Sequence, residues 1–290
     1  MHNILVTGSH GQLGCEIKEL SSDYSYTFFF TCKETLDIGD ASALEAFIQK
    51  NTITAIINCA AYTAVDKAEL DFQNSDKINH QAIKTLAELS KKHHVKLIHI
   101  STDYVFDGTN CKPYTETDTT NPQSLYGQTK RDGEKAIEMV NPKDSIIIRT
   151  SWMYSSYGNN FVKTMLRLGR EKTSLGVIYD QIGTPTYAKD LAQAILDILP
   201  KLNNQKTEIY HYSNEGVLSW YDFAKEIMNK AELTCKVIPI ETWQYPTPAK
   251  RPHYSLLNKS KIKSDYNIEI PYWKDSLNDC LQKLLSKTNS

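Results

Sequence analysis

The chain has 290 residues, of which 40% are hydrophobic, and its formal net charge is −1. This length and apolar content suit one large α/β domain, or one such domain with a smaller partner. The near balance of acidic and basic residues argues against a surface for nucleic acid or anionic lipid. No apolar run has the length of a membrane span and no leader-like segment precedes the first predicted strand, so we expect a cytoplasmic protein.

The six cysteines are scattered through the chain and form no Cys-x-x-Cys pair. This pattern predicts reduced thiols rather than a disulfide framework or a zinc site. The eight histidines show no ligand spacing either. From these residues alone we predict no metal site.

The first motif lies at the N-terminus, where a strand-like run Ile4–Thr7 leads directly into glycines at intervals of three. Glycines between a buried strand and a helix are typical of a dinucleotide-binding turn, in which they allow a tight bend, close approach to a pyrophosphate and close helix packing. The helix N-terminus also offers free N–H groups to the anion. The alternative is an ordinary glycine-rich turn. The predicted cofactor residues here are Gly8, His10, Gly11, Gln12, Leu13 and Gly14.

Strand-like and helix-like segments alternate through the first half of the chain, which predicts a doubly wound parallel Rossmann sheet of the α/β class, covered by helices on both faces. The predicted strands are Ile4–Thr7, Thr27–Thr31, Ala55–Asn58, Lys96–Ser101 and Ile146–Arg149. The predicted helices between them are Gln12–Leu20, Ala41–Lys50 after Asp40 as N-cap, Ser75–His93 and Leu125–Met139.

From Trp152 onward the elements are shorter and the loops contain proline. We therefore expect a Rossmann domain over residues 1–150 and a smaller, interleaved and mainly substrate-binding region over residues 151–290. Two strands, near Gly176–Tyr179 and Glu208–Tyr212, are predicted to return to the main sheet. Helices are predicted over Phe161–Leu168, Lys189–Leu199, Ser219–Lys230 with a capping box at Ser219, and Lys274–Leu285.

Tyr126 and Lys130 are four residues apart in a predicted helix, so they lie one turn apart on the same face. A phenol has a pKa near 10, and acid–base work at neutral pH asks for a decrease of about 3 units. A cation about 4 Å away supplies a decrease of that size. The pair therefore predicts a proton donor, although Tyr-x-x-x-Lys also occurs by chance in lysine-rich helices.

Ligands of a parallel sheet collect beyond the carboxyl ends of its strands. Polar or small residues follow the predicted strands at Gly8–Gly14, Asn58–Thr63, Ser101–Asp103 and Arg149–Trp152. Each segment alone also fits simple strand termination. Together with the tyrosine and lysine, they favour one active site at this edge, in which Ala60 and Ala61 let a cofactor lie against the backbone and Thr102 polarises a carbonyl.

These residues resemble the extended short-chain dehydrogenase/reductase superfamily and, more narrowly, the dTDP-4-dehydrorhamnose reductase family. The narrower resemblance rests on segments that run in the family's order over nearly the whole chain: Asn58–Glu69, Ser101–Gly108, Tyr126–Lys130, Arg149–Trp152, Gly158–Phe161, Asp180–Thr186 and Tyr245–Pro252. The resemblance implies reduction of the 4-keto group of dTDP-6-deoxy-L-lyxo-4-hexulose by a nicotinamide cofactor, the last step of dTDP-L-rhamnose synthesis.

The resemblance also implies roles for individual residues. Tyr126 would donate the proton, Lys130 would hold the nicotinamide ribose and Thr102 would bind the carbonyl oxygen. The remaining implied cofactor residues are Asp37, Ile38, Ala60, Ala61, Tyr62 and Thr63. The implied substrate residues are Thr102, Asp103, Trp152, Asn160 and Arg251, the last of them for the diphosphate.

Two properties of the family are in doubt from the sequence. The end of the second strand carries Lys33, which suits the 2′-phosphate of NADPH, while Glu34 keeps NADH open. Some family members dimerise around Mg²⁺ held by glutamates. Glu16 matches the first of these positions, but the others fall on Lys189 and Lys283. We therefore expect either a protein that needs no Mg²⁺ and does not form that dimer, or Lys–Glu16 pairs across it, so that a monomer and a homodimer both remain open.

Two other functions remain open at this point. One is a reductase or epimerase for another nucleotide-linked keto sugar, with the same fold and the same Tyr126 and Lys130. The other is a non-catalytic regulatory subunit that binds a partner enzyme. The presence of Thr102, Tyr126 and Lys130 argues against the regulatory subunit, since a site without chemistry has no physical need for the phenol–ammonium pair.

Overall fold

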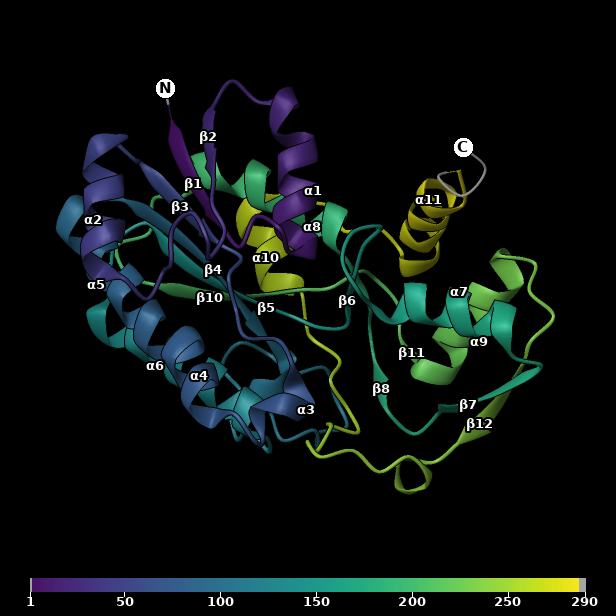
Figure 1. The fold of residues 1–290 in the computed structure, drawn as a ribbon. Helices are drawn as coiled ribbons and strands as arrows, with labels where there is room; N and C mark the ends of the chain where they lie inside the picture. The colour runs from purple at the N-terminus through teal and green to yellow at the C-terminus, as the bar shows by residue number, and fades with distance from the viewer. Residues whose placement is uncertain (1, 287–290) are drawn as a thin grey trace.

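A computed structural model describes residues 2–286 and contains a main sheet of six parallel strands in the order β10-β5-β4-β3-β1-β2 (Figure 1). The strands are β1 Asn3–Thr7, β2 Thr27–Phe30, β3 Ala55–Asn58, β4 Lys96–Thr102, β5 Ser145–Thr150 and β10 Glu208–Tyr212. The chain leaves β1 toward β2 on one side and then crosses to β3 on the other. The winding therefore reverses between β1 and β3, which confirms the predicted doubly wound sheet.

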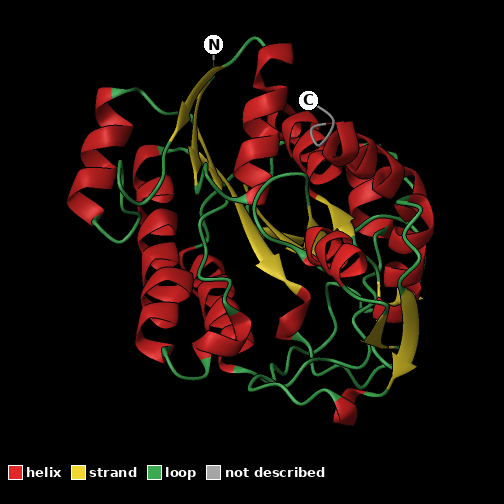
Figure 2. Ribbon diagram, turned by 45° about the vertical axis from the view of Figure 1, so that its right-hand side comes forward, coloured by secondary structure: helices red, strands yellow, loops and turns green. Residues whose placement is uncertain are grey.

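Helices cover both faces of this sheet, as Figures 1 and 2 show. One face is covered by α1 Gln12–Leu20, α8 Ala188–Ile198 and α10 Ser260–Tyr266, and the other by α2 Ala41–Lys50, α5 Ala82–His93 and α6 Leu125–Val140. Strand β1 explains the arrangement, because Ile4 and Val6 join the first core while Leu5 joins the second. All three side chains have no exposed surface, as expected for a strand covered on both faces.

Local capping agrees with the sequence. The side chain of Asp40 accepts a hydrogen bond from the backbone N–H of Ala43 at the start of α2 (3.0 Å), and Ser219 and Asp222 form the predicted capping box at the start of α9 Trp220–Lys230. The same physical rule gives Ser124 the N-cap position of α6. The N-cap at Ser124 therefore sets where the helix that carries Tyr126 begins.

The helix predicted over 75–93 differs from the structure. It begins earlier, at α4 Phe72–Asp76, and passes through a π-helical turn Lys77–Gln81 before α5. At this turn the carbonyl oxygen of Asn79 lies so close to Gly133 of α6 that a Cβ on the glycine would meet it at 2.1 Å. The π turn therefore brings α6 close to its neighbour, a packing effect that the helix pattern alone does not reveal.

The main sheet and the helices that cover it form the first lobe of the structure. The second, smaller lobe is built from several separate segments of the chain. It contains α7 Phe161–Glu171, α9, α11 Trp273–Ser286 and a two-stranded parallel sheet of β7 Ser174–Ile178 and β12 Lys236–Ile240. Short pairs join β6 Met153–Tyr154 to β9 Thr186–Tyr187, and β8 Ile182–Gly183 to β11 Leu218–Ser219. Because α8, β10 and α10 return to the first lobe between these segments, the two lobes are interleaved in sequence.

One of the two predicted returning strands is correct. Strand β10 pairs with β5 at the edge of the main sheet, but β7 does not join that sheet and the prediction for residues 176–179 is wrong. The burial patterns give the reason. Residues of β7 alternate between exposed and buried, which suits a small sheet with one covered face, whereas the last three residues of β10 are all buried.

A buried ion pair attaches α6 to the sheet. Arg149 of β5 donates from Nε and Nη2 to the two carboxylate oxygens of Glu134 (2.9 and 2.8 Å), and Ser101 of β4 donates to the same carboxylate (2.5 Å). Arg149 is 1% exposed and Glu134 is 0% exposed. Arg149, expected at the ligand edge, therefore fixes the position of α6 instead.

Within residues 2–286 no helix has the length and apolar character that crossing a membrane requires.

Candidate active site

A cavity of about 1140 Å³ opens at the carboxyl ends of β1, β3 and β4. It brings together nearly all of the side chains singled out by the sequence. The predicted residues that line it are Gly8, His10, Gly11, Gln12, Leu13, Asp37, Ile38, Ala60, Ala61, Thr63, Thr102, Asp103, Tyr126, Lys130, Trp152, Asn160 and Arg251. Gly14 and Tyr62 do not line it.

The glycine turn has the backbone geometry that its sequence implies. Gly8 has φ +66°, and a Cβ there would lie 2.6 Å from the backbone nitrogen of Ala60. Gly14 acts through packing, because a Cβ on it would lie 2.5 Å from the carbonyl oxygen of Gly8. No side chain caps the N-terminus of α1 at Gly11. The first turn of α1 therefore presents its N–H groups to the cavity, an arrangement suited to an anion.

Tyr126 lies at the other end of this cavity, on the first turn of α6, and its side chain is 8% exposed. Burial raises the pKa of Tyr126 to about 12, a hydrogen bond with Thr102 opposes this increase, and the charge of Asp103 adds to it. The sequence predicted that Lys130 lowers this pKa, and that prediction is wrong, because the pKa is raised and Lys130 is not among its causes. The phenol therefore holds its proton throughout the neutral range.

Lys130 explains the difference, because its ammonium is directed at the sheet. Its Nζ donates to the carbonyl oxygen of Ile100 (2.7 Å) and lies 3.3 Å from Nε2 of His99. Burial lowers the pKa of Lys130 to about 8, with a smaller opposing effect from Glu134. The cation is therefore partly engaged by β4 rather than by the phenol.

His99 was not among the residues predicted from the sequence. This residue has no exposed surface, and burial together with the charge of Lys130 holds its pKa well below the usual value, so the ring is neutral. Asn58 Nδ2 donates to His99 Nδ1 (2.9 Å), and the hydroxyl of Thr7 donates to Asn58 Oδ1 (2.6 Å). A polar residue inside the apolar run of β4 was the available signal. These contacts from β1 and β3 fix the orientation of the His99 ring, with its hydrogen on Nε2, so the acceptor that holds Lys130 is the carbonyl oxygen of Ile100.

Thr102 and Asp103 stand at the end of β4, beside Tyr126. The hydroxyl of Thr102 donates to Asp103 Oδ1 (3.0 Å), and Oδ2 of Asp103 is buried with no hydrogen-bond partner within the described structure. Burial raises the pKa of Asp103 to about 7, although hydrogen bonds from Thr102 and Ser255 oppose the increase. A buried oxygen without a partner next to the phenol is suited to binding a ligand hydroxyl.

Trp152 forms an aromatic wall of the cavity with a second tryptophan. Its ring stacks on Trp220 with centroids 3.7 Å apart and planes 14° apart, and Phe161 packs against Trp220 at 4.6 Å. Trp152 and Trp220 both line the cavity. Trp220 was not predicted as a site residue, because its place after a helix cap is its only signal in the sequence. The result is a broad apolar face of the kind that contacts sugar rings.

Two contacts join segments that are distant in sequence. Asn160 caps α7 and donates from Nδ2 to the side-chain oxygen of Gln12 (3.0 Å), which links the glycine turn to the smaller lobe. Arg251, expected to bind a diphosphate, forms a two-pronged ion pair with Asp66 (3.0 and 2.7 Å) and is partly exposed. This pairing lowers the pKa of Asp66.

Tyr62, which was predicted to bind the cofactor, does not line the cavity. Its hydroxyl donates a hydrogen bond to the carboxylate of Asp71 (3.0 Å).

Residues at the positions that match the family's Mg²⁺ ligands form an ion-paired cluster within one chain. Lys283 Nζ lies 3.6 Å from Oε2 of Glu16, and it also donates to Glu19. Glu16 has no exposed surface, accepts a hydrogen bond from Ser155 (2.5 Å), and has a pKa raised by burial. Lys189 is near enough to help lower the pKa of Glu19. A Lys–Glu16 contact was expected across a dimer, whereas the contact that the structure contains lies within one chain, between α1 and α11.

The chain is similar to known proteins over nearly its whole length. A family model described as the RmlD substrate binding domain matches residues 1–286. A dTDP-4-dehydrorhamnose reductase from Aggregatibacter actinomycetemcomitans is 41% identical over 287 residues, covering 96% of this chain and 97% of its own.

Two solved structures are similar over nearly the whole chain. A dTDP-4-dehydrorhamnose reductase from Clostridium acetobutylicum is 40% identical, with a TM-score of 0.92 and coverage of 98% of this chain and 99% of its own. The enzyme of that name from Bacillus anthracis, solved in complex with NADP, is 35% identical, with a TM-score of 0.92 and coverage of 97% and 99%.

The raised pKa of Asp103 predicts how its replacement changes stability with pH. Between about pH 4 and pH 7 the folded chain keeps a proton that the unfolded chain has lost, so this residue makes folding less favourable as pH rises. Asp103→Asn removes this term. The variant's free energy of unfolding, relative to the original protein, should increase by up to about 4 kcal/mol between pH 4.5 and pH 8 in urea titrations.

Asp66→Asn is a control of opposite sign, because the pKa of Asp66 is lowered, mainly by Arg251. Its carboxylate stabilises the fold above its unfolded pKa and loses that effect as pH falls. Asp66→Asn should therefore be most destabilising at high pH. A stability difference for Asp103→Asn that does not change with pH would contradict the assignment.

Proposed function

The chain belongs to the RmlD substrate binding domain family, and we propose that it reduces the 4-keto group of dTDP-6-deoxy-L-lyxo-4-hexulose to give dTDP-L-rhamnose. One observation carries this proposal. The cavity that begins at the uncapped N-terminus of α1 ends at the buried phenol of Tyr126, so an anion-binding turn and a proton donor face the same space. A reductase needs both.

The residues around the glycine turn fit a dinucleotide. The same cavity is lined by Cys32 and Lys33 and also by Trp220, and its volume is ample for a dinucleotide together with a sugar. The N–H groups at the start of α1 would hold the pyrophosphate, and Ala60 and Ala61 would leave room for the ribose and nicotinamide. When bound, the reduced nicotinamide supplies the hydride that reaches C4 of the sugar.

NADPH is the proposed cofactor, with NADH as the alternative. Lys33 lines the far end of the cavity and is exposed, so its ammonium is available to a 2′-phosphate. Glu34 lines the same end and would suit the free ribose hydroxyl of NADH. The NADP complex of the similar Bacillus anthracis enzyme supports the first choice.

Tyr126 is the proposed general acid. Its pKa near 12 keeps the phenol protonated at neutral pH, which is the form that reduction requires. As hydride arrives at C4, the carbonyl oxygen becomes an alkoxide, and an alkoxide is a stronger base than a phenolate. Proton transfer from the phenol to this oxygen is therefore downhill without prior acidification. Thr102 would donate a second hydrogen bond to the same oxygen after its hydroxyl turns from Asp103 Oδ1, to which it donates in this structure.

Lys130 has a supporting role in this mechanism. Its ammonium, held by the carbonyl of Ile100, lies one helical turn from the phenol and would bind the nicotinamide ribose. Once Tyr126 has given up its proton, a positive charge at this distance stabilises the phenolate. The ring of His99, 3.3 Å from the ammonium, is neutral and so adds no competing positive charge.

The substrate would occupy the part of the cavity that is lined by polar and aromatic side chains. Asp103 would bind a sugar hydroxyl, Trp152 would pack against the ring or its methyl group, and Asn160 would stand at the lobe junction. Arg251 would bind the diphosphate after leaving Asp66, because a guanidinium pairs with phosphate in the same two-pronged way. Residues 151–290 would thus supply most of the substrate contacts.

Lys283 supports independence from Mg²⁺. Its ammonium already provides a positive charge beside Glu16, at the place where the sequence match put a metal ligand in other family members. We expect turnover to be unchanged after exhaustive treatment with a chelator, measured with and without added Mg²⁺. Activity lost on chelation and restored by Mg²⁺ would refute this. A monomer and a homodimer are both compatible with the pair, because it forms within one chain.

The function itself is tested by mixing the protein with NADPH and the dTDP-4-keto-6-deoxy-L-sugar while the absorbance of the reduced cofactor is followed. We expect turnover with the dTDP-linked sugar and a much lower kcat/KM with the UDP- and GDP-linked sugars. A preference for another nucleotide would favour a sister reductase. Absence of turnover with all of them, with NADPH still bound, would favour a regulatory subunit.

Tyr126→Phe tests the proton donor. The change removes only the hydroxyl from a residue packed edge-on against Tyr104, so the fold and NADPH binding should be retained. We expect kcat to fall by about a hundredfold or more, the usual effect of losing a general acid. Tyr104→Phe is the matched control, since it removes a neighbouring phenol with no proposed proton transfer and should cost much less. Equal losses in both variants would contradict the assignment.

A further inference from the structure

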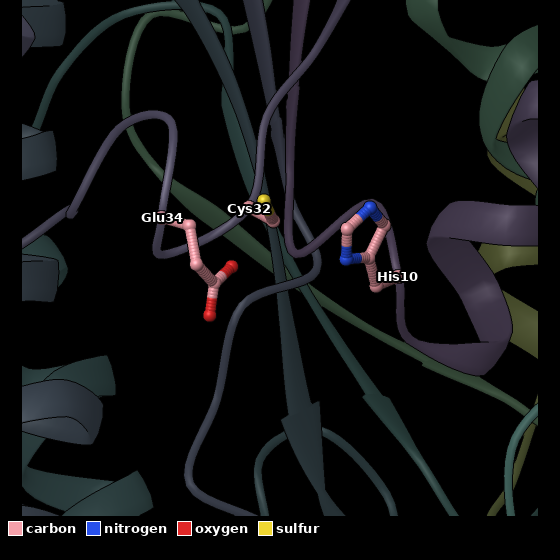
Figure 3. Close-up of side chains that lie close together, drawn as sticks. All are labelled: His10, Cys32 and Glu34. Carbon is pink, nitrogen blue, oxygen red and sulfur yellow. The ribbon is translucent and has the colours of Figure 1, made fainter.

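Three side chains with metal-binding atoms meet beside the glycine turn. His10 belongs to the turn between β1 and α1, while Cys32 and Glu34 follow β2. One ring nitrogen, the sulfur and one carboxylate oxygen all lie within 4.8 Å of one another. Figure 3 shows His10 and Glu34 on either side of Cys32. Among the residues that the structure describes, no other group of three or more His, Cys, Asp or Glu side chains comes this close.

The backbone holds these two loops next to each other. Ser9 donates from its backbone nitrogen to the carbonyl oxygen of Thr31 (3.0 Å), so the residues before His10 and before Cys32 are joined. Thr35 secures the second loop, because its hydroxyl accepts from the Cys32 N–H (2.9 Å). The backbone positions of the three side chains are therefore set by the fold.

We propose that His10, Cys32 and Glu34 form a binding site for a thiophilic divalent cation such as Zn²⁺. Zinc accepts imidazole, thiolate and carboxylate ligands at about 2.0–2.3 Å, which places tetrahedral ligand atoms about 3.3–3.8 Å apart. His10 and Glu34 are exposed and Cys32 is half-buried, so rotation about side-chain bonds can close the remaining distance of about 1 Å. Water would take the fourth position.

The charges of the proposed ligands balance the charge of a divalent cation. The thiol of Cys32 already faces the carboxylate of Glu34, and their hydrogen bond is the main cause of a lowered pKa for Glu34. On binding, the cation displaces the thiol proton to solvent, and thiolate plus carboxylate neutralise its two positive charges. His10 binds as the neutral ring. Lys33 opposes binding through its charge, and this predicts a moderate affinity rather than a permanent structural metal.

The location gives the site a consequence. His10, Cys32 and Glu34 all line the cavity assigned to the cofactor, at the end where Lys33 would meet the 2′-phosphate. A cation there would occupy the same space, so metal and NADPH should exclude each other. This consequence rests on the proposed cofactor site, whereas metal binding itself does not.

Cobalt(II) provides a direct readout, because a thiolate bound to Co²⁺ gives an intense near-ultraviolet absorption band. The metal-stripped full chain, free of cofactor, is titrated with Co²⁺ alone. We expect a saturable thiolate band that is lost in Cys32→Ser and retained in Cys111→Ser, in which another non-buried thiol is removed. Glu34→Gln should keep the band with affinity weaker by at least about tenfold, since even outer partners of metal ligands are worth about 10–100-fold.

Circular dichroism confirms that each variant is folded. Absence of the band in the original protein, or its persistence in Cys32→Ser, would overturn the proposal. Saturating NADPH should suppress the band. A band that depends on Cys32 and is indifferent to NADPH would leave the metal site standing and place the failure in the proposed cofactor site.

Discussion

The geometry of the active site depends on how α6 is attached to the sheet. The carboxylate of Glu134 receives two hydrogen bonds from Arg149 and one from Ser101, in a region with almost no solvent. Loss of Arg149 would leave the buried Glu134 carboxylate with the longer contact to Arg131 Nη1 (3.3 Å) as its remaining charged partner, at a cost of about 3–5 kcal/mol. Because Tyr126 and Lys130 lie on the same helix, this ion pair sets their height above the strand ends. The positions of Tyr126 and Lys130 thus depend on Arg149 and Glu134, which do not line the cavity.

Burial of the phenol changes the reasoning about catalysis. The sequence suggested that an adjacent cation must acidify Tyr126, yet desolvation raises its pKa and Lys130 is engaged by the carbonyl of Ile100. A protonated phenol is nevertheless what the reductive direction needs. The lysine matters after proton transfer, when the phenolate is the species that requires a positive charge. The same two residues therefore keep their proposed roles, for a different physical reason.

Local patterns predicted the parts of the fold that local physics determines. The glycine turn, the placement of Tyr126 and Lys130 one turn apart on α6 and the helix caps depend on a few neighbouring residues, and the structure contains all three. The partner of β7 depends on which distant strand covers its single apolar face, so its sequence did not exclude the main sheet. The contacts of His99 and the meeting of His10 with Cys32 and Glu34 arise only when separate loops come together, and no spacing in the sequence encodes them.

The central claim is that the cavity joins a hydride source to a protonated phenol across C4 of the sugar. The most direct test uses NADPH carrying deuterium at C4 of the nicotinamide, with the dTDP-4-keto-6-deoxy-L-sugar, followed by mass spectrometry and NMR of the product. Transfer of deuterium from one face of the nicotinamide to C4 of dTDP-L-rhamnose is predicted. Product without deuterium at that carbon, or deuterium at another carbon of the sugar, would contradict the account.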